Sequence, residues 1–228
     1  EFHRFSPRIH IHHRSVEGFL ANENMESANH LIWWLDFTNL GVNELHDVTS
    51  LANSLSSGDF LRITASANVR LDVDELGKLF GAAACRSVLK DEVEDFCVRF
   101  ESYLPDSFMS EQIYDDQLYP DLCVGMIKSA LEKRDNLTST RIWHMGSRIY
   151  RDGAQMVTCE FYVSSKPYDG TRRGLKYLNS CLNSERNAET INVPNLSIKE
   201  RLFLESAMPK NPESIVRFAK RLGYRIDN

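Results

Sequence analysis

The chain has 228 residues, of which 42% are hydrophobic and 26% are charged, and its formal net charge at pH 7 is -5. These values are typical of a globular protein and exclude a disordered chain, a collagen and a disulfide-stapled miniprotein. No apolar run approaches the roughly 18 residues of a transmembrane helix. The acidic balance argues against a broad nucleic-acid surface. Residues 1–5 resemble neither a signal peptide nor a natural start, so we expect a cloning scar or a chain cut from something longer.

The cysteines and histidines indicate no metal site. The five cysteines are well separated and form no CxxC pair, whereas a zinc site needs clustered ligands and a secreted framework needs paired cysteines. We therefore expect reduced thiols, a cytoplasmic location and no membrane association. His10, His12 and His13 lie close together, but no nearby carboxylate or cysteine completes a ligand set.

The first elements alternate between strand and helix. Residues 8–12 alternate in polarity and predict a strand, and a short helix is expected over 14–20 with Ser15 as its N-cap. Residues 30–37 are apolar on both faces, with Asp36 near the end. Such a run predicts a central parallel strand covered by helices on each side.

A crossover unit is expected next. Trp33 and Trp34 point to opposite faces of the strand, and both are expected in the core. Apolar spacing predicts a helix over 45–55, and residues 60–65 predict a second strand. Residues 33–65 thus form the strand–helix–strand unit of a parallel sheet.

The later pattern changes from helices to a hairpin and back to helices. Apolar spacing predicts three helices, over residues 72–79, 88–103 and 121–133. Two alternating segments around an Asp-Gly turn predict an antiparallel hairpin, over 141–150 and 155–164. A polar loop over 166–173 is followed by predicted C-terminal helices over 198–207 and 212–222.

This order resembles the later two thirds of the class I, Rossmann-like S-adenosylmethionine-dependent methyltransferases, whose last two strands form a hairpin with the final strand inserted antiparallel. Residues 15–20 (SVEGFL) resemble the segment that flanks the cofactor adenine, and residues 33–38 (WWLDFT) resemble the fourth-strand motif with an acid at the carboxyl edge. Two further segments are similar to the entry into strand five and to the hairpin of an O-methyltransferase-like branch, over 55–64 (LSSGDFLRIT) and 150–158 (YRDGAQMVT).

The resemblance implies an α/β fold with a Rossmann-like, mainly parallel sheet that ends in an antiparallel hairpin. It divides the chain into a partial methyltransferase core over 1–165 and a helical C-terminal extension over 166–228. The family binds its cofactor on a glycine-rich GxGxG loop, but none of the 11 glycines here forms a GxG pair. Either the first two strands are missing, or the protein never bound the cofactor.

Asp36 is the main candidate for catalysis. Ligands of open α/β sheets bind outside the carboxyl ends of the strands, where an acid holds the methionine amino group of the cofactor or acts as a general base. The alternative is a strand-terminating acid that caps the next turn. Thr38 and Asn39 follow in the same loop and are candidates for substrate binding, although they also suit an ordinary turn.

The resemblance further implies that Ser15, Val16 and Glu17 contact the adenine of S-adenosylmethionine. The alternative is a helix cap followed by a first-turn acid that the helix dipole favours. The function expected is transfer of a methyl group to an unknown acceptor oxygen or nitrogen. Two other functions stay open: a non-catalytic Rossmann-like interaction or regulatory subunit of a bacterial system, with a protein partner or a second copy, and a different nucleotide-binding enzyme.

Overall fold

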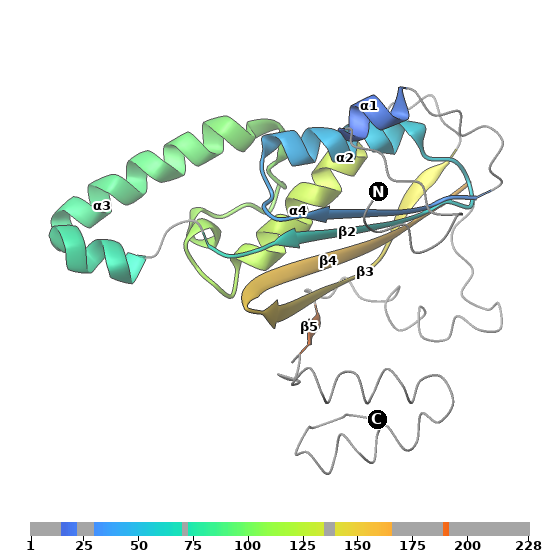
Figure 1. Cartoon of the computed structure of the whole chain (residues 1–228). Helices are drawn as coiled ribbons and strands as arrows, with labels where there is room; N and C mark the ends of the chain where they lie inside the picture. Colours follow the sequence, from blue (N-terminus) through green and yellow to red (C-terminus); the bar gives the residue numbers. More distant parts are fainter. Residues whose placement is uncertain (1–14, 22–29, 70–72, 135–139, 166–188, 192–228) are drawn as a thin grey trace, which may run out of the picture. The chain divides into compact units, whose positions relative to one another are not determined.

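The computed structural model describes residues 15–21, 30–69, 73–134, 140–165 and 189–191 (Figure 1). The chain divides into two compact units, residues 1–191 and 192–228, and the second unit lies outside the described residues. Several predicted elements also lie outside them: the strand over 8–12, the loop over 166–173 and the C-terminal helices. The boundary expected between 165 and 166 stays a prediction.

Two predicted helices form where local sequence signals place them. Helix α1 (Val16–Leu20) begins after Ser15, whose Oγ accepts a hydrogen bond from the N–H of Gly18 over 3.1 Å, so the predicted N-cap is confirmed. Helix α2 (Val42–Ser54) begins after Gly41, whose N–H donates to the carboxylate of Glu44 over 2.9 Å. Its apolar side is buried, at Leu45, Val48, Leu51 and Ala52.

The next two predicted helices are a single helix, which corrects the expectation of a break between residues 79 and 88. Helix α3 (Val73–Phe100) runs through the intervening sequence FGAAACRS, in which no large apolar residue follows Phe80 to mark a face. Its three alanines have the highest intrinsic helix propensity, so they continue the helix. Two short 3-10 turns (Glu101–Tyr103 and Ser110–Ile113) lead to helix α4 (Tyr119–Glu132), which confirms the prediction over 121–133.

The sheet is mixed. Its strands are β1 (Ile32–Phe37), β2 (Phe60–Ser66), β3 (Arg141–Asp152), β4 (Ala154–Ser164) and β5 (Glu189–Ile191), in the spatial order β1-β2-β4-β3-β5 (Figure 1). The β1–β2 and β3–β5 pairs are parallel, whereas β4 is antiparallel to both β2 and β3 over longer stretches. The α/β class and the hairpin are confirmed, but a mainly parallel sheet is not. The reason is the hairpin strand β4, which lies inside the sheet and makes both of its pairings antiparallel.

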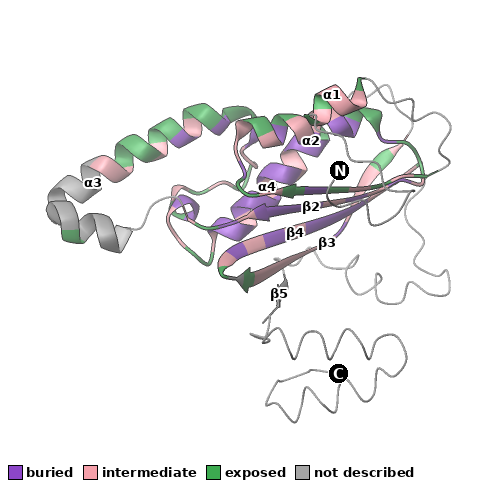
Figure 2. Ribbon diagram, viewed as in Figure 1, coloured by how far each residue is buried: buried purple, intermediate pink, exposed green. Residues whose placement is uncertain are grey.

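Helices α1, α2 and α4 lie on one face of this sheet, whereas α3 extends away from it and reaches the core only near its C-terminal end (Figure 1). Inward-facing side chains of β1, β2 and β4 form one apolar core with α2 and α4, and α1 and α3 add to it. The core strand residues alternate along the chain: Leu35, Leu61, Ile63, Ala65, Val157, Cys159, Phe161 and Val163. Figure 2 shows buried residues on the strands and on the helix sides turned toward them. We call the other side of the sheet the open face.

Strand β1 differs from its prediction as a central strand covered on both faces. It is an edge strand of the described sheet, and two of its side chains are strongly exposed: Ile32 by 83% and Trp34 by 64%. Trp33 points the other way and meets Phe19 of α1 edge to face, with ring centroids 6.2 Å apart. The prediction of two core tryptophans is therefore right for Trp33 and wrong for Trp34, because an apolar run does not show which of its faces is covered.

Two further observations concern the described part of the chain. No helix there is both long and apolar enough to cross a membrane. The cysteine side chains described there, Cys97, Cys123 and Cys159, are free thiols, as the spacing predicted.

Candidate functional site

Polar side chains line up in rows across the open face. Side chains of register partners point to the same face of a sheet. One row joins Trp34, Arg62 and Glu160 of β1, β2 and β4. The next row joins Asp36, Thr64, Thr158 and Arg148, the last of these on β3. Asp36 therefore stands beside the other polar groups of the open face, at the edge of the sheet.

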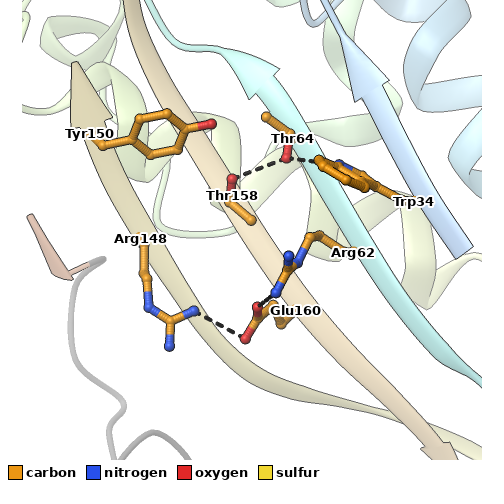
Figure 3. A pocket seen from close by; sticks show the side chains of 7 residues that line it. All are labelled: Trp34, Arg62, Thr64, Arg148, Tyr150, Thr158 and Glu160. Carbon is orange, nitrogen blue, oxygen red and sulfur yellow. Dashed lines mark hydrogen bonds and ion pairs between the residues drawn. The ribbon is translucent and has the colours of Figure 1, made fainter. Parts of the chain in front are cut away.

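A cavity of about 250 Å³ lies over these rows. Its lining comes from β1, β2, β4 and β3: Trp34, Arg62, Thr64, Thr158, Glu160, Arg148 and Tyr150 (Figure 3). Figure 3 shows Trp34 and Tyr150 on opposite sides, with the two threonines between them and the charged side chains below. We call this the open-face cavity.

Two arginines share one carboxylate in the open-face cavity. Glu160, whose side chain is 7% exposed, accepts from Arg62 with Oε1 and from Arg148 Nη1 with Oε2, the second contact at 3.1 Å. Arg148 is 15% exposed, while Arg62 reaches solvent with 42% of its side chain. The Nε of Arg62 is buried and has no hydrogen-bond partner among the described residues.

Trp34 is held in place by its indole nitrogen. Its Nε1–H donates to Thr64 Oγ1 over 3.3 Å, and the Thr64 and Thr158 hydroxyl oxygens lie 3.0 Å apart in a second hydrogen bond (Figure 3). The Arg62 guanidinium carbon lies 5.9 Å from the centroid of the indole ring, a cation–π contact. The ring is thus fixed while most of its surface stays exposed, an arrangement that the apolar core does not require.

The structure places the predicted catalytic and substrate residues at the carboxyl end of β1. Asp36 is exposed on the open face, and its carboxylate forms no hydrogen bond or ion pair with any other described residue. Thr38 and Asn39 are exposed in the bend that leads to α2. None of the three lines the open-face cavity itself.

The predicted adenine-binding residues lie elsewhere, on the helix-covered side. Ser15 caps α1, and Val16 is half-buried against the apolar core. Glu17 pairs with Nδ1 of His46 in α2 at 3.2 Å, and both side chains are exposed. No described contact joins these residues to Asp36. Their roles here match the alternative of a helix cap and a first-turn acid, and cofactor contact stays a prediction.

A second polar group faces the core instead of the open face. His144 hydrogen-bonds the Ser147 hydroxyl at 2.8 Å, and Ser147 in turn contacts Cys159 Sγ at 3.4 Å. Burial, together with the positive charge of Lys128, lowers the pKa of His144 to about 4. Burial raises the pKa of Cys159 to about 12. These directions hold both groups uncharged near neutral pH, as expected of packed polar residues inside a core.

Comparison with known proteins now identifies the family. A family model described as "Putative O-methyltransferase" matches residues 1–224. The chain belongs to this family. No curated protein and no solved structure matches the chain. Family membership confirms the resemblance to methyltransferases that the order of the elements indicated.

The sequence did not indicate most of the residues that line the open-face cavity. The apolar run predicts Trp34 in the core, and no sequence motif marks Arg62, Arg148 or Glu160. A signal was present, because Arg62 and Glu160 interrupt otherwise apolar strands at positions where alternation turns them away from the core. Their meeting is a matter of strand order, which the sequence does not display.

Proposed function

We propose that the protein transfers a methyl group from S-adenosylmethionine to a hydroxyl oxygen of a small acceptor. Family membership supports methyl transfer to oxygen. One observation places the proposed reaction at Asp36. Its carboxylate is exposed at the carboxyl end of a strand and has no partner among the described residues. This end of the strands is where ligands of open α/β sheets bind.

The strand directions support a Rossmann-like origin for the sheet. Strands β1 and β2 run in one direction, and β3 and β5 share it because β4 is antiparallel to both β2 and β3. The reversed strand is the last strand of the hairpin and lies between β2 and β3. Insertion of a final antiparallel strand is the feature by which the sequence resembles class I methyltransferases. We therefore propose that this sheet corresponds to the later part of theirs.

The described residues fit the cofactor in part. Asp36 offers hydrogen-bond acceptors, and the exposed carboxylate of Glu17 forms a weak surface pair with His46. A backbone cradle is the missing part, because no GxG pair occurs among the 228 residues. The same observation favours the second candidate function, a methyltransferase-like module that serves in interaction or regulation and does not bind the cofactor.

Few side chains are needed for the proposed reaction. When bound, S-adenosylmethionine supplies an electrophilic methyl group on a sulfonium, and the transfer depends mainly on position and on exclusion of water. We assign to Asp36 the task of accepting a hydrogen bond from the acceptor hydroxyl and taking its proton. Thr38 and Asn39, two and three residues further along, are proposed to orient the same acceptor.

Calorimetry of S-adenosylmethionine and its demethylated product with the full chain tests cofactor binding. We expect saturable binding of both, and no binding up to millimolar concentration would favour the non-catalytic module. Methyl transfer from labelled cofactor to a panel of phenols and alcohols then tests the role of Asp36. Asp36→Asn is expected to lower the turnover about 100-fold or more, whereas Asp106→Asn at another exposed acid should leave it unchanged. Equal turnover in the two variants would remove Asp36 from the site.

A further inference from the structure

We infer that two copies of this chain dimerise through the open face of the sheet, about a two-fold axis that runs along the strands between β2 and β4. Helices α1, α2 and α4 lie on the other face, and the open face has accessible side chains on all four long strands. Three properties of the open face carry the inference: an apolar row, a match of large and small residues, and a match of opposite charges.

An apolar row crosses the open face near the start of β1. The strand register sets four large side chains next to one another: Ile32, Phe60, Tyr162 and Trp143. None of them belongs to the apolar core on the other side of the sheet. Ile32 is 83% exposed, and Trp34 in the next row is 64% exposed. Exposed apolar surface that is contiguous marks an interaction site, because its burial releases water.

A two-fold axis along the strands reverses the strand order across the interface. Because the axis lies between β2 and β4, it sets β1 against β3 of the second copy, and β2 against β4 of the second copy. Each row then faces the same row of the second copy in reverse order, and every contact occurs twice. Sheets that stack with their strands nearly aligned, about 10 Å apart, are a common packing.

The apolar row matches itself in this arrangement. Ile32 faces Trp143 of the second copy, and Phe60 faces Tyr162 of the second copy. An axis across the strands would instead set the apolar row against the charged rows. The apolar row therefore favours the axis along the strands.

Trp34 faces a residue that leaves room for it. Its row runs Trp34, Arg62, Glu160, Gly146, so the reversed row sets the indole against Gly146 of the second copy, which has no side chain. A large side chain opposite a small one allows close packing. The hydrogen bond from the indole to Thr64 already fixes the ring, so its burial costs little conformational freedom.

Opposite charges also meet. Arg62, which is 42% exposed, faces Glu160 of the second copy, and in the next row Asp36 faces Arg148 of the second copy. On the four long strands, these two rows hold two carboxylates and two guanidinium groups, so their burial encloses no net charge. Strand β5 lies beyond this overlap, because no described strand stands opposite it. Asp36 has two carboxylate oxygens, so one can face the guanidinium while the other accepts a hydrogen bond from a methyl acceptor.

Sedimentation equilibrium of the full chain at micromolar concentrations, without S-adenosylmethionine, tests the dimer. We expect the mass to rise from 26.2 kDa for one copy to twice that value. Trp34→Glu should weaken the dimer at least about tenfold, since it removes an aromatic anchor and adds a charge at the interface. Val98→Glu, at an apolar residue of α3 that is 78% exposed, is the matched control and should dimerise like the parent.

Two results overturn the inference. One is a parent that stays monomeric, which leaves the open face to a different protein. The other is a Trp34→Glu variant that dimerises as tightly as the parent. If Trp34→Glu does not fold, Ile32→Glu replaces it, because this side chain is also exposed and outside the core.

Cross-linking tests the axis. A chain with Ile32→Cys is mixed with a chain with Trp143→Cys and treated with a short bis-maleimide, and peptide mass spectrometry identifies the links. Positions 32 and 143 should be linked between copies more often than positions 98 and 143 in a control mixture that contains Val98→Cys. Equal linking in the two mixtures refutes the axis along the strands. Neither experiment involves methyl transfer, so its outcome is independent of the proposed function.

Discussion

Arg148 Nη1 and Glu160 Oε2 lie 3.1 Å apart across β3 and β4, on the side of the sheet away from the apolar core. The other oxygen of Glu160 accepts from Arg62 of β2, so one carboxylate connects three strands. These contacts give the open face a defined electrostatic centre. They also make Glu160 a residue on which stability should depend.

Replacing Glu160 with Gln should lower the free energy of unfolding by about 2–3 kcal/mol, because both guanidinium groups then lose the buried carboxylate that lies between them. The cost stays below that of a fully buried pair since Arg62 is partly exposed. Urea unfolding followed by tryptophan fluorescence measures it. The control is Asp95→Asn, which removes the exposed i,i+4 pair with Arg99 and should cost no more than about 0.5 kcal/mol. Equal losses would contradict the prediction.

The folded protein should lose stability through His144 as the pH falls. Its folded pKa of about 4 lies below its unfolded value near 6.5, so the unfolded state binds the proton more tightly. The stability that neutral His144 contributes to the folded state is fully present above pH 6.5 and is lost toward pH 4. About 2 kcal/mol of it is lost by pH 5. Urea unfolding gives the free energy of unfolding at pH 7 and at pH 5. The loss of this free energy between the two pH values should be smaller for His144→Gln than for the parent. His46→Gln, at an exposed histidine, is the control and should keep the parent's difference.

Asp59 should be needed to fix the start of β1. This carboxylate is 2% exposed and accepts from the N–H groups of Leu31 and Ser56 at 2.8 and 2.9 Å. Asp59→Ala removes the buried acceptor of both partly buried N–H groups and should cost about 1–3 kcal/mol. Asp59→Asn keeps one acceptor oxygen and should cost less. The melting temperatures of both variants are compared with that of Asp106→Ala, which changes an exposed acid. If Asp59→Ala is as stable as this control, the two hydrogen bonds of Asp59 do not stabilise the fold.

Cys159 should resist thiol reagents while the protein is folded. It is fully buried in the core, and its raised pKa keeps the thiolate population very small at pH 8. Cys97 is only half-buried and should be modified first. Alkylation at pH 8 followed by peptide mass spectrometry gives the rate at each position. We expect Cys159 to be labelled only after denaturant is added, and labelling as fast as at Cys97 would disprove its protection.

The helices and the hairpin were predictable because their signals are local. Ser15 caps α1 through a hydrogen bond three residues away, and the turn at Gly153, with φ of 75°, needs only the Asp-Gly pair beside it. The position of Asp36 at the carboxyl end of β1 was also predictable, since this acid interrupts the apolar run near its end. The break predicted within α3 is wrong because apolar periodicity gives no signal over residues 81–87, where no large apolar side chain marks a face.

Local signals do not decide which strands become neighbours, and this is where the tertiary structure was needed. The sequence by itself determined the order of the elements and thereby the family. The family resemblance already implied that the final hairpin strand is inserted antiparallel, but only the folded chain decided that β1 is at an edge of the described sheet and that Trp34 faces away from the core. Arg62 and Glu160 are 98 residues apart in the chain. They meet because pairing in a sheet is set by non-local packing and hydrogen bonding, which no short stretch of sequence encodes.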